Sequence, residues 1–206
     1  MGAFRRWLVG QFSWPRGVAG SFAGRIMASR PSNRVRNRET IRLLGIGPDD
    51  TVLEIGCGPG LGIEEARRLA TCGAVTGLDR SRTMLKQAAR RLRRTRLADR
   101  VALIEGDASV AISLAPAATR IFGVNVAQFI SERAIFIKNL AGGMPPGGRL
   151  ALTYQPRDAH PTRASAEAMA KTLDAEMREA GLTVTIHEIG LKPVPAFCVI
   201  GEAKGL

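Results

Sequence analysis

The segment at residues 52–60 constrains the fold of this chain more than any other. It reads VLEIGCGPG, an apolar run followed by glycines at three alternate positions. Only glycine adopts left-handed backbone conformations without strain and lets the main chain approach a ligand closely. Where such a turn joins a buried strand to a helix, it lies at the carboxyl end of a parallel strand, the edge at which open α/β sheets bind ligands. The segment therefore predicts an α/β fold with a nucleotide-like ligand.

Short apolar runs alternate with amphipathic segments from residue 51 onward, a pattern typical of a mainly parallel sheet with helices on both faces. The apolar runs predict strands at 51–55, 74–78, 101–104, 120–126, 149–154, 183–189 and 196–201. The amphipathic segments predict helices at 61–70, 81–94, 132–140 and 162–180. Only residues 190–195 separate the last two strands. This connection is too short for a helical crossover, so we expect the two strands to pair antiparallel.

These elements predict a single Rossmann-like, doubly wound α/β domain. Its seven-stranded sheet is mostly parallel and ends in an antiparallel C-terminal hairpin. The chain has 206 residues, of which 45% are hydrophobic, as expected for one globular domain. We place this ligand-binding domain at residues 46–206.

The first 45 residues differ in composition from the rest. Aromatic residues alternate there with arginines: Phe4, Trp7, Phe12, Trp14 and Phe22 with Arg5, Arg6, Arg16 and Arg25. We expect residues 1–45 to form a basic, aromatic and helical N-terminal arm, whose helix at 38–44 ends at Gly45. Three roles remain open for the arm: a lid with residues 30–38 near the mouth of the site, a peripheral contact with an anionic membrane, or plain packing on the sheet.

The net charge of +12 is concentrated in two regions. Residues 1–42 carry nine arginines against one acid, and residues 80–100 carry eight arginines and one lysine against one acid. Such regions attract nucleic acid, an anionic membrane surface or an acidic substrate. A solvated basic helix face is the simpler interpretation of residues 80–100.

Other sequence features narrow the class of protein. No stretch reaches the roughly 18 apolar residues that a membrane span requires, and the N-terminus lacks the apolar core and cleavage site of a secretion signal. Cys57, Cys72 and Cys198 form no CxxC pattern and no cluster with histidine. We therefore predict neither disulfides nor a metal site. We expect a cytoplasmic protein.

The spacing of the glycines selects between cofactors. A dinucleotide fingerprint, G-x-G-x-x-G, requires a third glycine at position 61 or 63, counted from Gly56 or Gly58. The chain has Leu61 and Ile63 there, which disfavours a dehydrogenase. The pattern is instead acid-x-G-x-G-x-G, and it resembles motif I of the class I S-adenosylmethionine-dependent methyltransferases.

This resemblance extends to later strand ends and implies the cofactor site. In the family the glycine loop holds the amino-acid part of S-adenosylmethionine, an acid after the second strand accepts the ribose hydroxyls, and the acid of a GDA motif accepts the adenine amino group. Here Asp79 follows the second predicted strand, with Ser81 the better N-cap for the next helix. The segment 106–108 reads GDA, and 140–148 is close to the family's turn before the fifth strand. We predict cofactor contacts from Glu54, Gly56, Cys57, Gly58, Gly60, Asp79, Arg80, Asp107, Ala108 and Asn125.

The sequence departs from the family pattern at residues 109–119, which lack its usual acidic and aromatic residues. We expect this segment to be a less anchored loop. On the acceptor side, the candidates are Gln128, Tyr154 and His160. His160 is the best base if an acidic hydroxyl or thiol is methylated, and an exposed loop histidine is the alternative. His187 lies within a late predicted strand, where we expect a structural role.

The resemblance implies methyl transfer to a small-molecule acceptor, a lipophilic one given the aromatic arm, with S-adenosylhomocysteine as the product. The chemistry is an in-line displacement, so we expect positioning and no obligatory catalytic triad. One alternative is an RNA or other nucleic-acid methyltransferase that uses the basic surface. Amino-directed base methyltransferases carry an Asn/Asp-Pro-Pro-Tyr-like tetrad, whereas residues 125–128 read NVAQ. The other alternative is a non-catalytic protein that binds S-adenosylmethionine. The oligomeric state is left open.

Overall fold

The computed structural model describes residues 31–158 and 160–205. The strands are β1 (Val52–Ile55), β2 (Val75–Asp79), β3 (Val101–Glu105), β4 (Arg120–Val124), β5 (Arg149–Tyr154), β6 (Thr183–Ile189) and β7 (Ala196–Glu202). The α-helices are α3 (Pro31–Leu44), α4 (Leu61–Leu69), α5 (Arg82–Thr95), α6 (Ala108–Leu114), α7 (Arg133–Gly143) and α8 (Arg163–Glu179). Two 3-10 turns, η1 (Ala115–Ala117) and η2 (Ala127–Phe129), flank β4.

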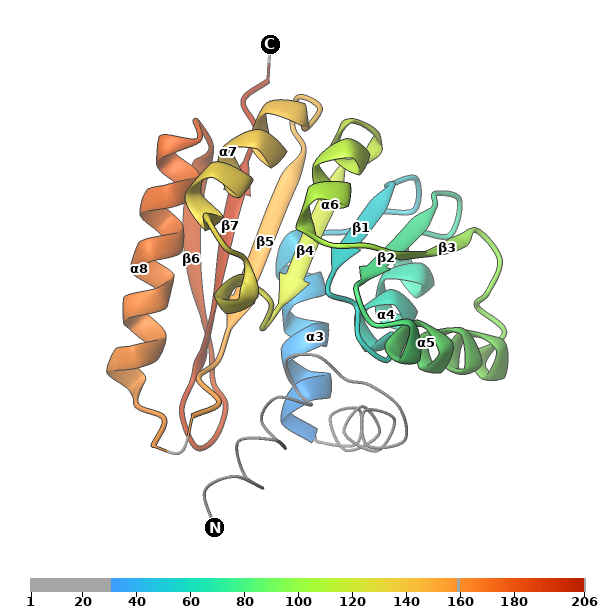
Figure 1. Ribbon diagram of the computed structural model, residues 1–206, viewed down its shortest axis with the longest axis horizontal. Coiled ribbons are helices and arrows are strands. Elements are labelled where there is room, and N and C mark those ends of the chain that lie inside the picture. The colour runs from blue at the N-terminus through green and yellow to red at the C-terminus, as the bar shows by residue number, and fades with distance from the viewer. Residues whose placement is uncertain (1–30, 159, 206) are drawn as a thin grey trace.

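The strands form one seven-stranded sheet in the order β3-β2-β1-β4-β5-β7-β6 (Figure 1). The first five strands in this order pair in parallel. β7 pairs antiparallel with both β5 and β6. The predicted fold and its C-terminal hairpin are therefore confirmed. His187 lies in β6 opposite Cys198 of β7, within a strand as predicted.

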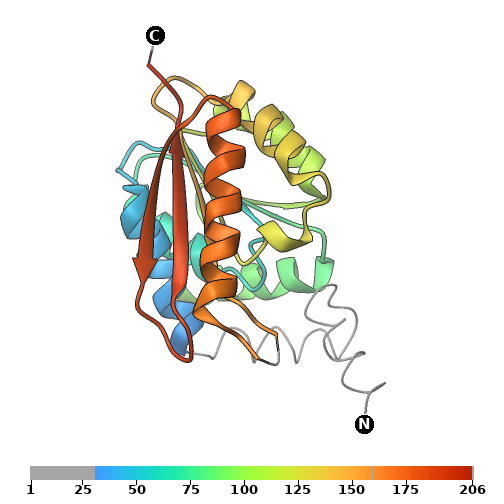
Figure 2. The same ribbon diagram turned by 90° about the vertical axis from the view of Figure 1, so that its left-hand side faces the viewer.

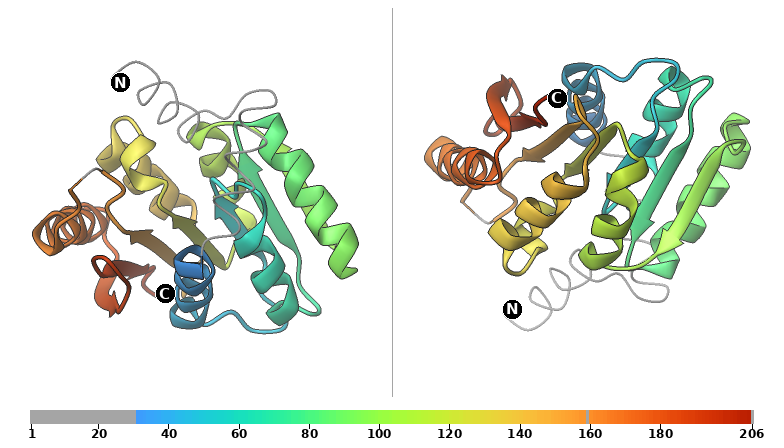
Figure 3. Two further views of the ribbon diagram at one scale, coloured as in Figure 1. Left: turned by 90° about the horizontal axis from the view of Figure 1, so that it is seen from below. Right: turned by 90° about the horizontal axis from the view of Figure 1, so that it is seen from above.

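Two helical layers cover the sheet, with α3, α4 and α5 on one face and α6, α7 and α8 on the other (Figures 2 and 3). Successive side chains of β1 point to opposite faces of the sheet and so contribute to both apolar layers. Leu53 belongs to the apolar cluster beneath α6–α8, and Val52 belongs to the cluster beneath α3–α5. Because the central strands are buried on both faces, they are apolar almost throughout. Phe122 of β4 is fully buried in the second cluster.

The helix predicted at 38–44 begins earlier, at Pro31. Proline is suited to the first helical turn because its fixed φ fits a helix and its missing N–H is not needed there. The added turns were not predicted because their buried residues, Arg36 and Asn37, are polar and break the apolar periodicity. α3 packs against α4, β4 and β5. The aromatic and arginine positions predicted within residues 1–30 lie outside the described residues.

The expectation of a less anchored loop at 109–119 is wrong. This segment forms most of α6 and the turn η1, and Ala111 and Ala115 are fully buried against the sheet and α7. Asp107 starts the helix as its N-cap, and small alanine side chains allow close packing in place of aromatic anchors. Ser81 is the N-cap of α5, as predicted. β4 stops at Val124, two residues before its predicted end.

Within the part of the chain that the structure describes, no helix has both the length and the apolar character needed to cross a membrane.

We expect Phe122→Ala to lower the free energy of unfolding by about 3–5 kcal/mol, because it leaves a cavity in a fully buried position. Phe129→Ala is the matched control, since Phe129 lies seven positions later in the same crossover and is 44% exposed. The control should change stability by less than about 0.5 kcal/mol. Urea denaturation of both variants measures the difference, and equal losses would contradict the assigned core.

Candidate functional site

The turn after β1 is left-handed at three positions. The φ angles are 69° at Gly56, 52° at Gly58 and 78° at Gly60, values that a residue with a Cβ atom adopts only with strain. The N–H groups of Gly56 and Cys57 donate to the carbonyl oxygen of Leu78 at 2.8 and 3.0 Å. The turn therefore folds against the end of β2 before Gly60 caps α4.

Of the three glycines, Gly58 faces open space. A Cβ atom at Gly56 would lie 2.8 Å from Cγ2 of Val126, and one at Gly60 would lie 2.8 Å from Cβ of Ala88. A Cβ atom at Gly58 would meet no atom within 4 Å. Gly56 and Gly60 are thus required by close packing as well as by φ. The backbone at Gly58 is accessible to a ligand, which is the geometry that a cofactor cradle requires.

Asp79, at the end of β2, ties this loop to the neighbouring strand. Its Oδ2 accepts a hydrogen bond from the N–H of Gly58 at 2.8 Å, and its Oδ1 accepts one from the N–H of Ser81 at 2.8 Å. Burial raises the pKa of the Asp79 carboxyl, while the two backbone donors and the charge of Arg80 oppose the rise. Each oxygen keeps a lone pair. Asp79 can therefore accept two ribose hydroxyls while it holds the loop.

Glu54 is buried in β1 and supports the same loop from the sheet side. The backbone N–H of Ile63, in the first turn of α4, donates to its carboxylate, and burial raises its pKa well above the usual range. The negative charge of Asp79 adds to this rise. Oε2 of Glu54 has no hydrogen-bond partner among the described residues. This oxygen is the atom that a ligand's ammonium group or a bridging water would bond.

Asp107 is exposed and lies at the start of α6, where Ala108 is the first helical residue. Its Oδ1 accepts hydrogen bonds from Oγ and the N–H of Ser109 at 2.6 and 2.9 Å, and these bonds lower the pKa of the carboxyl. Both bonds go to one oxygen, so Oδ2 remains for a ligand donor. This is the arrangement needed to accept an adenine amino group.

Asn125 has a left-handed φ of 55° and joins the ends of β4 and β5. Its Nδ2 donates to the carbonyl of Gln155 at 2.7 Å, and its Oδ1 accepts from the N–H of Gln155 at 3.1 Å. Both polar atoms of the amide are thus bonded to the backbone beyond β5, and one N–H of Nδ2 and one lone pair of Oδ1 remain.

The three acceptor-side candidates lie in different environments. Gln128 is half-buried; its Nε2 donates to the carbonyl of Asn125 at 3.0 Å, and its buried Oε1 has no partner among the described residues. Tyr154 ends β5, and burial together with the charge of Asp158 raises its pKa. His160 is exposed in the loop before α8, where its backbone N–H donates to Asp158. The structure therefore places Gln128 and Tyr154 at the strand ends and His160 on the surface.

Gln155 and Arg36 also belong to this side of the site, and the sequence did not indicate them. Gln155 donates to the carbonyl of Val194 at 2.8 Å through Nε2 and accepts from Nη1 of Arg36 through Oε1. Arg36 also donates to Oδ1 of Asn33 at 2.6 Å. Both Arg36 and Gln155 are buried. Polar residues on a helix surface or after a strand are ordinarily solvated, so no sequence signal distinguished them.

A neighbouring buried pair strengthens the same contact between α3 and β5. The hydroxyl oxygens of Thr40 and Thr153 lie 2.6 Å apart, and Thr40 also donates to the carbonyl of Arg36 at 2.8 Å. These bonds satisfy the buried hydroxyl groups of Thr40 and Thr153, as burial requires. α3 is consequently fixed beside the acceptor side of the sheet.

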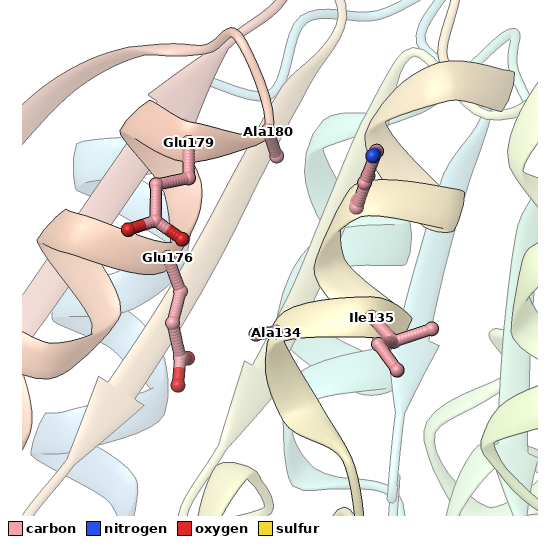
Figure 4. Close-up of a pocket in the computed structure, with 6 residues that line it drawn as sticks. Ala134, Ile135, Glu176, Glu179 and Ala180 are labelled. Carbon is pink, nitrogen blue, oxygen red and sulfur yellow. The ribbon is translucent and has the colours of Figure 1, made fainter.

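One cavity among the described residues lies away from these strand ends. It has a volume of about 260 Å³ and lies between α7 and α8, where Glu176, Glu179 and Ala180 face Ala134 and Ile135 (Figure 4). None of the predicted site residues lines it. Its rim is held by Arg133, which bonds both carboxylate oxygens of Glu176. We therefore locate the functional site from the strand ends and not from this cavity.

The predicted cofactor residues meet at one edge of the sheet. β3, β2, β1 and β4 are neighbours in parallel, so their carboxyl ends lie side by side (Figure 3). Along this edge come Asp107, Asp79, the glycine loop and Asn125. An adenine acceptor, a ribose acceptor and an open backbone cradle thus follow one another in order. These donors and acceptors fit S-adenosylmethionine, the cofactor implied by the sequence.

Comparison with known proteins agrees with this geometry. The family described as "Methyltransferase domain" matches residues 52–148. An uncharacterised methyltransferase, YdaC of Bacillus subtilis (strain 168), is 30% identical over 181 residues, which cover 87% of this chain and 97% of YdaC.

Two further proteins cover different shares of the chain. The trans-aconitate 2-methyltransferase of Afipia carboxidovorans is 36% identical over 102 residues, which are 49% of this chain and 37% of that enzyme. The crystal structure of magnesium protoporphyrin IX methyltransferase (ChlM) from Synechocystis PCC 6803, with bound S-adenosylmethionine, superposes with a TM-score of 0.63 at 18% identity. It covers 98% of this chain and 92% of that one, and at this identity it supports the fold alone.

We expect Gly58→Ala to lower the affinity for S-adenosylhomocysteine at least about tenfold, because the added Cβ projects into the open cradle. Gly147→Ala is a closely matched control: Gly147 also has a left-handed φ, of 73°, with no atom within 4 Å of an added Cβ, but it lies in the turn before β5. Both variants should lose about 1–2 kcal/mol of stability from backbone strain. Calorimetric titration should show the affinity loss in Gly58→Ala alone, and equal affinities would contradict the cradle.

We expect Glu54→Gln to stabilise the protein at high pH and not at low pH. The folded state raises the pKa of Glu54. As the pH rises above the ordinary value of about 4.3, the unfolded chain therefore ionises first, and folding loses stability until the pH passes the folded pKa. A neutral amide removes this loss. Thermal denaturation of both proteins between about pH 4 and pH 8 measures the difference. A variant that is less stable at every pH would contradict a buried-charge cost.

Proposed function

Because this chain belongs to the class I S-adenosylmethionine-dependent methyltransferases, we propose that it methylates a small-molecule acceptor bound beside the carboxyl ends of β4 and β5. The bound S-adenosylmethionine supplies an electrophilic methyl group on a sulfonium centre, and S-adenosylhomocysteine is the product. The protein's contribution is to hold the acceptor in line with that methyl group.

Residues at the ends of different strands would bind different parts of the cofactor. The open backbone at Gly58 and the partnerless oxygen of Glu54 would bind the amino-acid part of the cofactor. Asp79 would bind the ribose, and Asp107 with Ala108 would bind the adenine. These carboxylates are acceptors when ionised, so they orient the cofactor through its hydroxyl and amino donors. Cys57 lies buried in the loop and contributes its backbone.

The observation that carries the proposal is the buried, partnerless Oε1 of Gln128. A buried carbonyl oxygen without a donor costs roughly 1–3 kcal/mol, and a ligand hydroxyl or amino group would satisfy it. Its amide nitrogen is fixed by Asn125, which is fixed in turn by Gln155. Because these bonds fix the position of Oε1, this oxygen would favour an acceptor that carries a hydrogen-bond donor at the matching position.

The same geometry disfavours methylation of a nucleic-acid base. Base methyltransferases of the amino-directed kind hold a flipped base with the polar groups of their tetrad after the fourth strand. Here the side chain of Asn125 is engaged by the backbone of Gln155 through both of its polar atoms. A small acceptor that bonds Gln128 does not require the polar groups of such a tetrad.

The described residues offer no strong general base that would remove a proton from the acceptor. The pKa of Tyr154 is raised, so its phenol stays neutral and would serve as a hydrogen-bond donor. His160 lies in the exposed loop on the same side and would act as a base only for an acidic hydroxyl or thiol. Positioning is therefore the principal contribution in this proposal.

The names of related proteins support a small acceptor. Trans-aconitate and magnesium protoporphyrin IX, which appear in the names of two of them, are both small molecules. The chain spans only 37% of the trans-aconitate enzyme, so its acceptor pocket is not expected to be the same. We propose a lipophilic acceptor, because five aromatic residues lie within the 30 positions that precede α3 in the sequence.

Incubation with methyl-labelled S-adenosylmethionine, a cell metabolite extract and total RNA tests the proposal. We expect label in the low-molecular-mass fraction and none in RNA. Gln128→Met, which keeps the side-chain length and removes the amide, should reduce this transfer at least about tenfold and leave the affinity for S-adenosylhomocysteine within about twofold.

Two outcomes would contradict the proposal. Label found only in RNA would assign a nucleic-acid acceptor. No transfer to any fraction, despite tight binding of S-adenosylmethionine by calorimetry, would favour a non-catalytic binding protein. NAD serves as the control ligand in that titration, and we expect it not to bind.

A further inference from the structure

Helix α5 carries a row of basic side chains along its solvent side. We call Lys86, Arg90, Arg93, Arg94 and Arg96 the basic stripe; all five are exposed. The first four follow the i, i+4, i+7, i+8 spacing that places residues on one helix face, and Arg96 caps the C-terminus. Within the part of the chain that the structure describes, none of these five side chains has a hydrogen bond or ion pair, and the helix itself contains no acidic residue.

Several arginines on the other surface helices pair with acids one turn away. Arg68 pairs with Glu64 in α4 at 2.6 Å, and Arg42 pairs with Glu39 in α3 at 2.8 Å. In α8 the two pairs are Arg163 with Glu167 at 2.7 Å and Arg178 with Asp174 at 2.9 Å. Within α5 itself, Arg82 pairs with Glu105 at 2.8 Å and Arg91 pairs with Glu64 at 3.1 Å. The basic stripe is the part of this helix whose charges no described acid balances.

The stripe works against the stability of its own helix. Like charges three or four positions apart, such as Lys86 with Arg90 and Arg90 with Arg94, repel each other. The helix dipole favours cations in the last turn, which accounts for Arg93, Arg94 and Arg96 in part. It does not account for Lys86 and Arg90 in the middle of the helix. An external anionic surface would remove the repulsion along the whole stripe.

The surroundings of the stripe select among anionic partners. Helices α3, α4 and α5 contain no aromatic residue, so they lack the aromatic platforms on which single-strand binders usually stack bases. The cavity between these helices measures only about 80 Å³, and Glu64 and Glu65 line it beside Arg34 and Arg38. Two acids in such a small cavity would repel a phosphate strand. A broad anionic surface needs neither a groove nor stacking partners.

We propose that the basic stripe of α5 docks this protein on an anionic membrane surface. Clusters of four to eight Lys and Arg on an amphipathic helix are the usual means of such docking, and α5 keeps its apolar side, including Met84 and Leu92, buried in the protein. The contact is therefore electrostatic and reversible. Arg34 and Arg38 of the same helical layer extend the basic surface, and the exposed Val35 lies between them in sequence. This docking goes beyond the proposed transfer site, which lies at the ends of β4 and β5.

Vesicle co-sedimentation of the full chain tests the docking. We expect binding to vesicles of phosphatidylcholine with about one third phosphatidylglycerol, and none to pure phosphatidylcholine. Binding should weaken as salt rises from about 50 to 200 mM. Each basic residue at the surface contributes roughly fivefold to binding, so R90E/R94E should reduce binding by at least about 25-fold. K138E/K171E is the matched control, because it makes the same change in net charge with exposed lysines of α7 and α8.

Several results would overturn the docking proposal. These are equal losses in the two double variants, equal binding to neutral and anionic vesicles, or no binding at about 50 mM salt. Binding of a labelled single-stranded RNA that R90E/R94E abolishes, without vesicle binding, would assign the stripe to nucleic acid instead. Calorimetric titration with S-adenosylhomocysteine verifies that both variants remain folded, since neither alters the cofactor residues.

Discussion

The bond between Asp79 and Gly58 is the interaction on which the cofactor side of this protein depends. One carboxylate oxygen at the end of β2 holds the left-handed turn after β1, and the other holds the start of α5. A single side chain thus sets the relative positions of two strands, the glycine loop and a helix. Because the same carboxylate would receive the ribose, the geometry of the loop and the binding of the cofactor are mechanically linked. The burial that raises its pKa is the cost of placing it there.

The acceptor side depends on a different device, the buried polar contact between α3 and the ends of β4 and β5. Arg36, Gln155 and Asn125 form a chain of hydrogen bonds that ends at Gln128. Buried polar groups are ordinarily hydrogen-bonded, and this chain of bonds ends at the buried Oε1 of Gln128, which has no partner among the described residues. A helix packed only by apolar contacts could slide along the sheet. The polar contact fixes α3, and with it the wall beside the acceptor.

Much of the fold was predictable, and the reasons are physical. Apolar periodicity located all seven strands to within two residues. For the central strands β1, β4 and β5 the reason is burial on both faces, which tolerates few polar residues. The glycine spacing and the acids Asp79 and Asp107 could be recognised in the sequence, because backbone freedom and carboxylate chemistry are properties of residue type. The helix at α6 was missed because its anchors are alanines, whose burial depends on what lies beneath them. Arg36 and Gln155 were missed because charge and polarity ordinarily indicate exposure.

The sequence by itself determined that this chain forms a mostly parallel sheet with a glycine turn and acids at consecutive strand ends, since each follows from local periodicity and residue chemistry. Only the tertiary structure decided the strand order, in which β7 lies between β5 and β6, and the partners of Asn125 and Glu54. It also revealed that, within α5, Arg82 and Arg91 pair with acids of other elements, whereas the five side chains of the basic stripe form no ion pair with a described residue. Contacts between residues far apart in sequence arise from packing, and packing is a property of the assembled layers that no local pattern records.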